Sequence, residues 1–365
     1  MNEYKRLGDY IQEIDVRNRD LSITTLLGVS ISKEFIPSIA NTIGTDMTTY
    51  KIVRKSQFAY GPVTSRNGDK VSIALHTREE AAIISQAYTV FEIKDTNKLL
   101  PEYLMMWFRR PEFDRYARFH SHGSAREIFD WDEMCDVSLP IPPIERQREI
   151  VAEYETLSKR TSLNEQMISK LEQTAQTLYR KMFVEGIDKE NLPEGWSVDT
   201  LANLAILKAG GDKPTDFSEI KDEYYKIPVY ANGFENKGIF GYTTKPTITE
   251  QSITISARGT IGYCFLRKQP YVPIVRLIVI IPNSKSISQY LYYYLENSNI
   301  KGSGSVQSQL TVPDMEAIKI ILPPKNLLIE FYNRAEIIDK YIALYEQENE
   351  KLTELQSLLL ARMRR

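Results

Sequence analysis

The sequence has few cysteines and no long uninterrupted hydrophobic segment. Two cysteines, Cys135 and Cys264, in 365 residues cannot build the disulfide framework of a small secreted protein. The apolar run from Ile274 to Ile281 contains Arg276 and is far shorter than the ~18 residues that a membrane-spanning helix needs. The N-terminal residues also lack the apolar core of a signal peptide. These absences predict a cytoplasmic protein with no membrane association.

An excess of positive charge is also missing. The chain has 46 Lys and Arg residues against 48 Asp and Glu residues, which gives a formal net charge of −2. A protein that binds nucleic acid alone is normally basic, because neutralised phosphates supply most of its sequence-independent affinity. Two explanations remain open. Either the chain does not bind nucleic acid, or its basic residues gather on one face while a partner supplies much of the phosphate contact.

Catalytic motifs are absent as well. The two Pro-Pro pairs lie in Ile141–Ile144 and Leu322–Lys325, without the preceding polar residue and following aromatic of an amino-methyltransferase loop. No G-x-x-x-x-G-K-[ST] phosphate-binding loop is present. His120 and His122 alternate as on a strand, but the sequence offers no third metal ligand beside them. We therefore expect a non-catalytic chain that binds no metal or cofactor of its own.

The strongest positive feature is an internal repeat, in which residue i matches residue i+181. The segment Gly123–Met182 aligns without a gap to Gly304–Met363. Identical pairs include Gly123 and Gly304, Met134 and Met315, Pro142-Pro143 and Pro323-Pro324, Lys159 and Lys340, Leu163 and Leu344, Leu171 and Leu352, Leu178 and Leu359, and Met182 and Met363. A register kept over this length indicates duplication of one structural unit.

The second part of each repeat has the pattern of a long helix. Each follows a Pro-Pro pair, which suits the first turn of a helix. Seam positions recur at steps of three and four residues, a ~3.5-residue period typical of coiled coils. Two amphipathic helices on separate cores remain the alternative. The seam comprises Ile150, Tyr154, Leu157, Thr161, Asn164, Ile168, Leu171, Ala175, Leu178 and Met182, then Phe331, Ala335, Ile338, Ile342, Tyr345, Asn349, Leu352, Gln356, Leu359 and Met363.

The sequence between the helices predicts two globular heads. β-rich stretches such as Leu277–Ile281 lie beside helical ones such as Glu102–Arg109, which indicates mixed α/β domains. The Leu192–Trp196 turn opens the second head. The heads show little sequence repetition, unlike the helices. We predict a first head at 1–143, a central helix at 144–185, a second head at 186–324 and a C-terminal helix at 325–365.

Both heads contain polar and basic segments with glycines, which suit contacts to nucleic acid. Arg and Lys can read guanine, and Asn or Gln can read adenine, in the major groove. Solvated loops have a similar composition, but matching clusters in both heads favour recognition. The candidate residues of the first head are Lys51, Arg54, Lys55, Tyr60, Thr64, Ser65, Arg66, Asn67, Lys70, Arg115, Arg118, His120, His122, Ser124 and Arg126. Those of the second head are Asn232, Lys237, Tyr242, Lys245, Arg258, Thr260, Lys301, Ser303, Ser305 and Gln307.

Over its whole length the sequence resembles the specificity subunits of type I restriction-modification systems. The motifs that carry the resemblance are Leu139–Gln147 at the start of the first helix, Leu192–Trp196, Ser256–Gly262, and Gly302–Ser305 before the second Pro-Pro pair. Together with the half-chain repeat they form a specific combination. The second helix begins at Pro323–Leu328 without the Glu and Gln of the first, which leaves open whether two partner sites are equally strong.

The resemblance implies a fold and a set of partners. Each head would be a target recognition domain for one half of a split site in double-stranded DNA, and the two helices would pair as an antiparallel coiled coil. Two methyltransferase subunits would dock around the coil, and restriction subunits would join them. S-adenosylmethionine, ATP and Mg²⁺ would belong to these partners. A non-catalytic coiled-coil adaptor is the alternative function, although it leaves the unlike heads unexplained.

Overall fold

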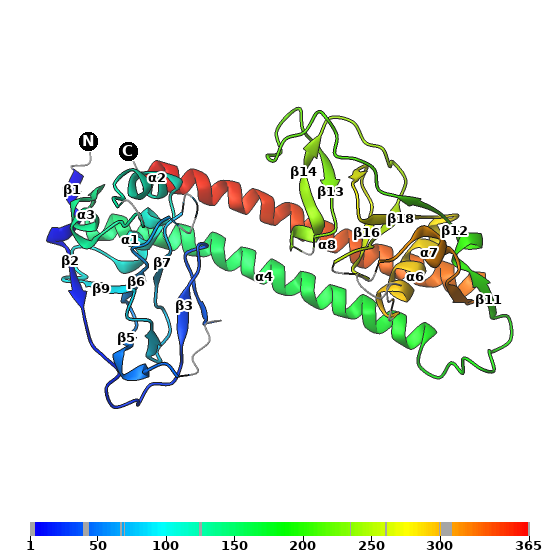
Figure 1. Ribbon diagram of the computed structural model, residues 1–365, viewed down its shortest axis with the longest axis horizontal. Helices are drawn as coiled ribbons and strands as arrows, with labels where there is room; N and C mark the ends of the chain where they lie inside the picture. The colour runs from blue at the N-terminus through cyan, green and yellow to red at the C-terminus, as the bar shows by residue number, and fades with distance from the viewer. Residues whose placement is uncertain are drawn as a thin grey trace. The chain divides into compact units, whose positions relative to one another are not determined.

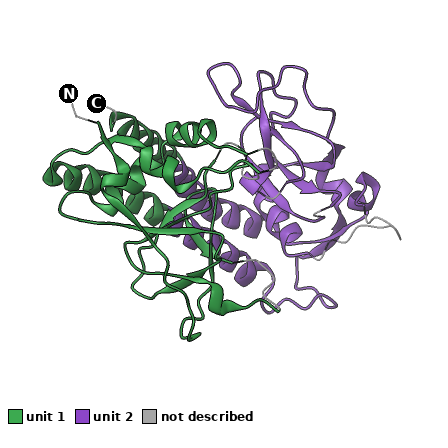
Figure 2. Ribbon diagram, turned by 60° about the vertical axis from the view of Figure 1, so that its left-hand side comes forward, with its two compact units in different colours: residues 1–164, 347–365 green, residues 165–346 purple. Residues whose placement is uncertain are grey.

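The computed structural model describes residues 4–38, 44–65, 68, 70–123, 126–233, 235–259, 261–298, 300 and 309–363. It divides into two compact units (Figure 2). Unit 1 comprises residues 1–164 and 347–365, and unit 2 comprises residues 165–346. The predicted starts of the two long helices agree with the structure, since α4 spans Ile144–Phe183 and α8 spans Lys325–Arg362 (Figure 1). Each unit therefore contains one head with part of both long helices.

Unit 1 is built on a four-stranded antiparallel sheet in the order β2-β9-β6-β7. Three two-stranded ladders, β1-β10, β3-β4 and β5-β8, complete its β structure. Its elements are β1 (Tyr4–Arg6), β2 (Ile11–Ile14), β3 (Leu27–Val29), β4 (Phe35–Pro37), β5 (Lys51–Val53), β6 (Phe58–Tyr60), β7 (Ile73–Leu75), β8 (Ala82–Ile84), β9 (Thr89–Ile93), α1 (Pro101–Phe108), α2 (Pro111–Phe119), α3 (Trp131–Asp136) and β10 (Ser138–Pro140).

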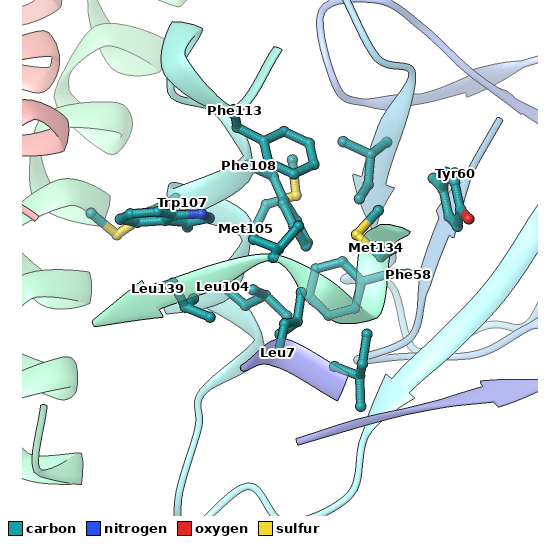
Figure 3. Close-up of a cluster of buried hydrophobic side chains, with 14 of the residues drawn as sticks. Leu7, Phe58, Tyr60, Leu104, Met105, Trp107, Phe108, Phe113, Met134 and Leu139 are labelled. Carbon is teal, nitrogen blue, oxygen red and sulfur yellow. The ribbon is translucent and has the colours of Figure 1, made fainter. Parts of the chain in front are cut away.

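Aromatic and aliphatic side chains fill the core of unit 1 (Figure 3). Phe58 of β6 stacks on Phe91 of β9 with ring centroids 4.8 Å apart. Seven of the eight residues of α1 are buried, so this short helix runs through the core rather than over it. Val151 of α4 and Met363 after α8 belong to the same cluster. The head and the adjoining helix segments therefore share one hydrophobic core.

Unit 2 has a four-stranded antiparallel sheet in the order β12-β18-β15-β16, a three-stranded sheet β14-β13-β17, and the ladder β11-β19. Its core includes Tyr179 and Phe183 of α4, which contact Phe331 of α8. The elements are β11 (Ser197–Thr200), α5 (Leu201–Leu204), β12 (Ala205–Ala209), β13 (Ile227–Tyr230), β14 (Ile239–Thr243), β15 (Ser252–Ser256), β16 (Cys264–Arg267), β17 (Val272–Pro273), β18 (Leu277–Pro282), α6 (Lys285–Glu296), α7 (Val312–Glu316) and β19 (Lys319–Leu322).

The two heads share a topology that their sequences do not display. In both four-stranded sheets, the first strand in chain order pairs with the fourth, the fourth with the second, and the second with the third. In both units a further ladder joins a strand at the start of the head to the strand just before the long helix. The heads therefore correspond in their main sheet and in this ladder, and the duplication extends into the heads.

The long helices pair antiparallel within each unit, and none of the predicted seam side chains is exposed. In unit 1, Asn164 donates to Asn349 at 2.9 Å, and Gln356 donates to Ser158 at 2.9 Å. In unit 2, the rings of Tyr179 and Phe331 lie 6.1 Å apart. The predicted antiparallel pairing of the two long helices is therefore confirmed. In the described part of the chain, no helix has the length and apolar character needed to cross a membrane.

Gln147 explains the difference between the two helix starts. Its side chain is fully buried, donates to the carbonyls of Lys98 and Pro142 at 2.8 Å each, and accepts from the backbone of Leu100 at 2.9 Å. It thus fastens the first head to its own helix. Leu328, at the equivalent repeat position, packs into the core of unit 2 instead. The missing Gln therefore reflects an internal contact and gives no measure of partner affinity.

Candidate nucleic-acid interface

In unit 1, two predicted clusters come together on one surface. Val63, in the loop after β6, forms an antiparallel backbone bridge with Ile128, which follows α2. The backbone N–H of Thr64 donates to the carbonyl of Glu127 at 3.0 Å, and its hydroxyl donates to Ser121 Oγ at 2.9 Å. Loops about 60 residues apart in sequence are thereby held as one polar platform, which we call the first loop surface (residues 61–65 and 120–128, as far as described).

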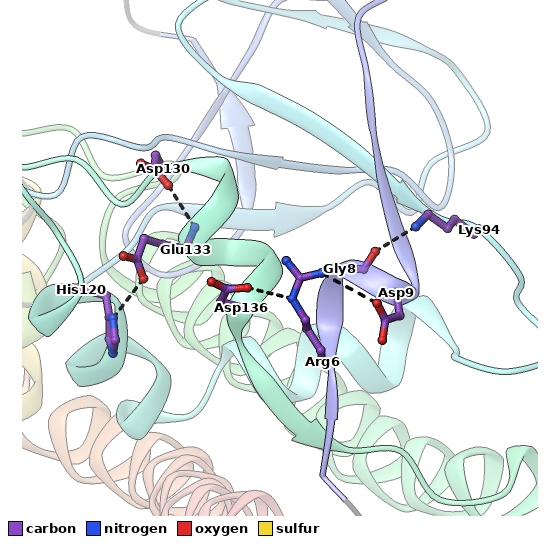
Figure 4. Close-up of polar contacts among 8 residues, drawn as sticks. All are labelled: Arg6, Gly8, Asp9, Lys94, His120, Asp130, Glu133 and Asp136. Atoms are coloured by element: carbon purple, nitrogen blue, oxygen red, sulfur yellow. Dashed lines mark hydrogen bonds and ion pairs between the residues drawn. The ribbon is translucent and has the colours of Figure 1, made fainter.

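Carboxylate side chains contact basic side chains on this surface and next to it. Glu133 lies 3.0 Å from Nδ1 of His120 and 3.5 Å from Nε2 of His122. Asp130 caps α3 by accepting from the backbone N–H of Glu133 at 3.0 Å (Figure 4). Arg118 forms an ion pair with Glu127. Carboxylates therefore position these three basic candidates.

Unit 2 contains a corresponding arrangement. Arg258, in the loop after β15, forms an antiparallel bridge with Gln309. The backbone N–H of Leu310 donates to the carbonyl of Ala257 at 2.8 Å. The side chain of Asn232 donates to the carbonyl of Arg258 at 2.8 Å, which brings the segment after β13 to the same place. We call residues 230–233, 257–259 and 309–310 the second loop surface.

The repeat shows that the two loop surfaces are equivalent. Ile128 and Gln309 are separated by the repeat offset of 181 residues. Ile128 bridges to the loop after β6 and Gln309 to the loop after β15, and each of these strands is the second of its main sheet in chain order. Val63 and Arg258 therefore occupy matching places. The same backbone frame presents different side chains in the two heads, as two surfaces with different targets require.

Three predicted contact residues of the first head are buried. Lys51 is 6% exposed and lies 3.5 Å from Glu13. Tyr60 is fully buried on β6 in the main sheet, and desolvation raises the pKa of its phenol. Thr64 is 1% exposed, and its hydroxyl is used within the protein. Contrary to expectation, these three side chains are buried and are not available to contact DNA.

The other candidate DNA-binding side chains differ in exposure and in ion pairing. Lys55 pairs with Glu79, and Lys237 pairs with Glu346 at 2.7 Å. Exposed side chains are Arg54, Ser65, Lys70, Arg115, His122, Arg126, Lys245 and Arg258, while Tyr242 is half-buried. Arg66, Asn67, Ser124, Thr260, Lys301, Ser303, Ser305 and Gln307 lie outside the described residues. Arg258 combines exposure with a fixed place in its loop surface.

Two exposed aromatic features were missed from the sequence. Phe119 is 81% exposed at the end of α2, inside a run of Arg and His residues that could have drawn attention to it. In unit 2, the Lys213 ammonium lies 3.5 Å from the ring centroid of Phe217 and 5.4 Å from that of Phe240. These three residues lie up to 27 residues apart in the sequence and meet only in the folded chain, so no local sequence motif predicts the cluster.

Neither cysteine lies in the environment of a reactive thiol. Burial raises the pKa of the Cys135 and Cys264 thiols, which keeps both sulfurs protonated and poorly nucleophilic at neutral pH. Within the ranges that the structure describes, no group of three His, Cys, Asp or Glu side chains is placed to hold a metal ion. The exposed Arg, Lys and aromatic side chains suit contacts to phosphates and bases.

Comparisons with known proteins point in one direction. The family model described as "Type I restriction modification DNA specificity domain" matches residues 32–173 and 193–357. A putative type I specificity subunit from Mycoplasma pneumoniae is 31% identical over 206 residues, covering 56% of this chain and 55% of that protein. A second from the same organism is 36% identical over 141 residues, covering 39% of this chain and 41% of that protein. The chain thus matches about half the length of these relatives.

Two further comparisons cover more of the chain. The specificity subunit of the type I restriction enzyme HindI from Haemophilus influenzae is 21% identical over 400 residues, covering 86% of each protein. The crystal structure of a type I restriction-modification S subunit from M. genitalium aligns with a TM-score of 0.59 at 14% identity, covering 100% of this chain and 96% of that chain. This structural likeness concerns the fold.

Proposed function

Since the chain belongs to the type I restriction-modification DNA specificity family, we propose that it is a non-catalytic specificity subunit that reads a bipartite site in double-stranded DNA. Each head reads one half-site through its loop surface. The observation that carries this proposal is the equivalence of Ile128 and Gln309, which places different side chains on one repeated frame. Two such surfaces suit two unlike half-sites.

The proposal includes protein partners. On α8, Ile337, Tyr341 and Leu344 recur at helical spacing and are 57%, 54% and 59% exposed. A contiguous exposed apolar face of this kind is typical of a surface that a partner covers. We assign it to a methyltransferase subunit, with a second methyltransferase subunit and restriction subunits completing the complex. The partners then carry S-adenosylmethionine, ATP and Mg²⁺ and supply the phosphate contacts that a chain of net charge −2 lacks. Such a complex works in the cytoplasm, where it meets DNA.

The test is to express the chain with its methyltransferase subunit and to map modified bases by sequencing. We expect methylation in a single two-part motif, and exchange of residues 186–324 for the head of a relative should change one half of the motif only. The purified chain alone should show no methylation, cleavage or ATP hydrolysis. A complex that forms but modifies DNA without a bipartite motif would instead support the adaptor function.

A further inference from the structure

The most exposed large apolar side chain among the described residues is Phe119, at 81%. It is the last residue of α2, which spans Pro111–Phe119. An exposed phenyl ring gains nothing for folding, since its apolar surface stays in water. Single exposed apolar residues are common, so the surroundings of Phe119 decide whether the ring has a function.

The surroundings hold this ring in place from one side. The ring of His120 contacts Phe119 edge to face, with centroids 5.2 Å apart. His120 in turn stacks on Tyr116 at 4.2 Å, and its Nδ1 lies 3.0 Å from Glu133 (Figure 4). Asp130 caps the helix that carries Glu133. His120, itself held by Tyr116 and Glu133, therefore supports the ring of Phe119 on one side.

The supporting residue His120 belongs to the first loop surface. His120 and Ser121 directly follow Phe119, and Ser121 Oγ accepts from Thr64 at 2.9 Å. Arg115, four residues before Phe119 on α2, has 68% of its side chain exposed and lies 3.7 Å from Glu112, and Arg126 of the first loop surface is also exposed. An exposed apolar ring on a surface that also carries exposed Arg and His side chains suits DNA binding, because basic side chains meet phosphates and the ring meets the base stack.

We propose that Phe119 is a wedge that inserts between two base pairs of the half-site read by the first head; this proposal rests on the proposed function. Inserted apolar side chains partly unstack a base step and kink the duplex, and a ring held in place before binding loses little freedom. Ile300, at the equivalent repeat position, is half-buried. The second head therefore presents no exposed ring at that position.

The experiment uses the full complex with the methyltransferase subunit and a duplex that carries the motif mapped in cells. Base steps of the first half-site are replaced one at a time by the fluorescent analogue 2-aminopurine, and end-to-end distance is followed by energy transfer. Wild-type complex should raise the fluorescence at one step and shorten the duplex. Phe119→Ala should abolish both signals and weaken specific binding by about tenfold or more, because no side chain then fills the gap between the two unstacked base pairs. Phe119→Leu should retain a large part of each signal.

Ile31→Ala is the matched control, since this apolar residue of the same unit is also exposed, at 48%. It should leave both signals unchanged. If the wild-type complex binds the motif and Phe119→Ala behaves identically, the wedge is wrong while the proposed function stands. If Phe119→Ala weakens the methyltransferase subunit's binding in the absence of DNA, the ring is a protein contact and the wedge is again wrong. If the wild-type complex shows no preference for the motif, the proposed function itself fails.

Discussion

Arg258 combines an exposed side chain with a backbone held on both sides. Its carbonyl accepts from Asn232 at 2.8 Å, and its backbone bridges to Gln309. We expect Arg258→Ala to weaken binding to the cognate site by roughly 1–3 kcal/mol, because a bidentate Arg–guanine contact contributes about that much discrimination. Affinity measured on cognate and random duplexes checks this.

The exposed Lys189, in the segment that follows α4, offers a control. Lys189→Ala should leave the ratio of cognate to random affinity unchanged. Equal weakening of both duplexes by Arg258→Ala would identify Arg258 as a phosphate contact and contradict base recognition at this position.

At the scale of elements, the helix pair is anchored in unit 2 by Phe331. This ring is fully buried and contacts Tyr179, Phe183 and Tyr293. Phe331→Ala should destabilise the unit by about 3–5 kcal/mol, because it removes buried aromatic surface and leaves a cavity. Urea unfolding measures the change. Tyr341→Ala, at a 54% exposed position of the same helix, should cost little, and equal costs would contradict the role of the buried ring.

The helix pair in unit 1 should respond to acid through Glu348. Hydrogen bonds from Arg160, and then from Asn164, hold the pKa of Glu348 below its ordinary value of 4.5. A carboxylate with a lowered folded-state pKa stabilises the fold above its unfolded-state pKa, and this contribution is lost as pH falls through the folded-state value. Thermal unfolding between about pH 6 and pH 3 should therefore show a shallower decline for Glu348→Gln than for wild type.

Glu350→Gln is the control for this acid response, because Glu350 is exposed on the same helix. Its decline between these pH values should match that of wild type. If Glu348→Gln also declined as steeply as wild type, the carboxylate would have no part in the acid sensitivity of the helix pair.

At the scale of the whole molecule, α4 is the covalent connection between the two heads, and α8 pairs with it in both units. The unit boundaries fall after Asn164 and after Glu346. Seven residues inserted at both places preserve the seam period and add about 10.5 Å of helix at ~1.5 Å per residue. If the helices act as a ruler along the duplex, the spacer between half-sites should lengthen by about two or three base pairs, since ten pairs span ~34 Å.

Sequencing of modified bases after expression with the methyltransferase subunit measures the spacer. An insertion of two residues at each place is the control, because it puts the seam out of phase and should prevent assembly. Retained methylation with an unchanged spacer after the seven-residue insertion would mean that the heads or the partners set the distance.

Periodic features were predictable because they arise from local geometry. The 3.5-residue seam and the Pro-Pro starts of α4 and α8 depend on helical spacing and on the conformational limits of proline. The repeat offset of 181 residues follows from comparing the chain with itself. These features determined the duplication and the long helices from the sequence alone.

Tertiary structure decided which candidate side chains reach the surface. Lys51, Tyr60 and Thr64 have residue types suited to DNA, yet strand pairing and loop bridging bury them. The shared strand order of the heads was equally hidden, because many apolar sequences satisfy one sheet pattern and little identity is needed to keep it. Residue type and spacing are local properties, whereas burial depends on contacts between segments distant in sequence, and these exist only after folding.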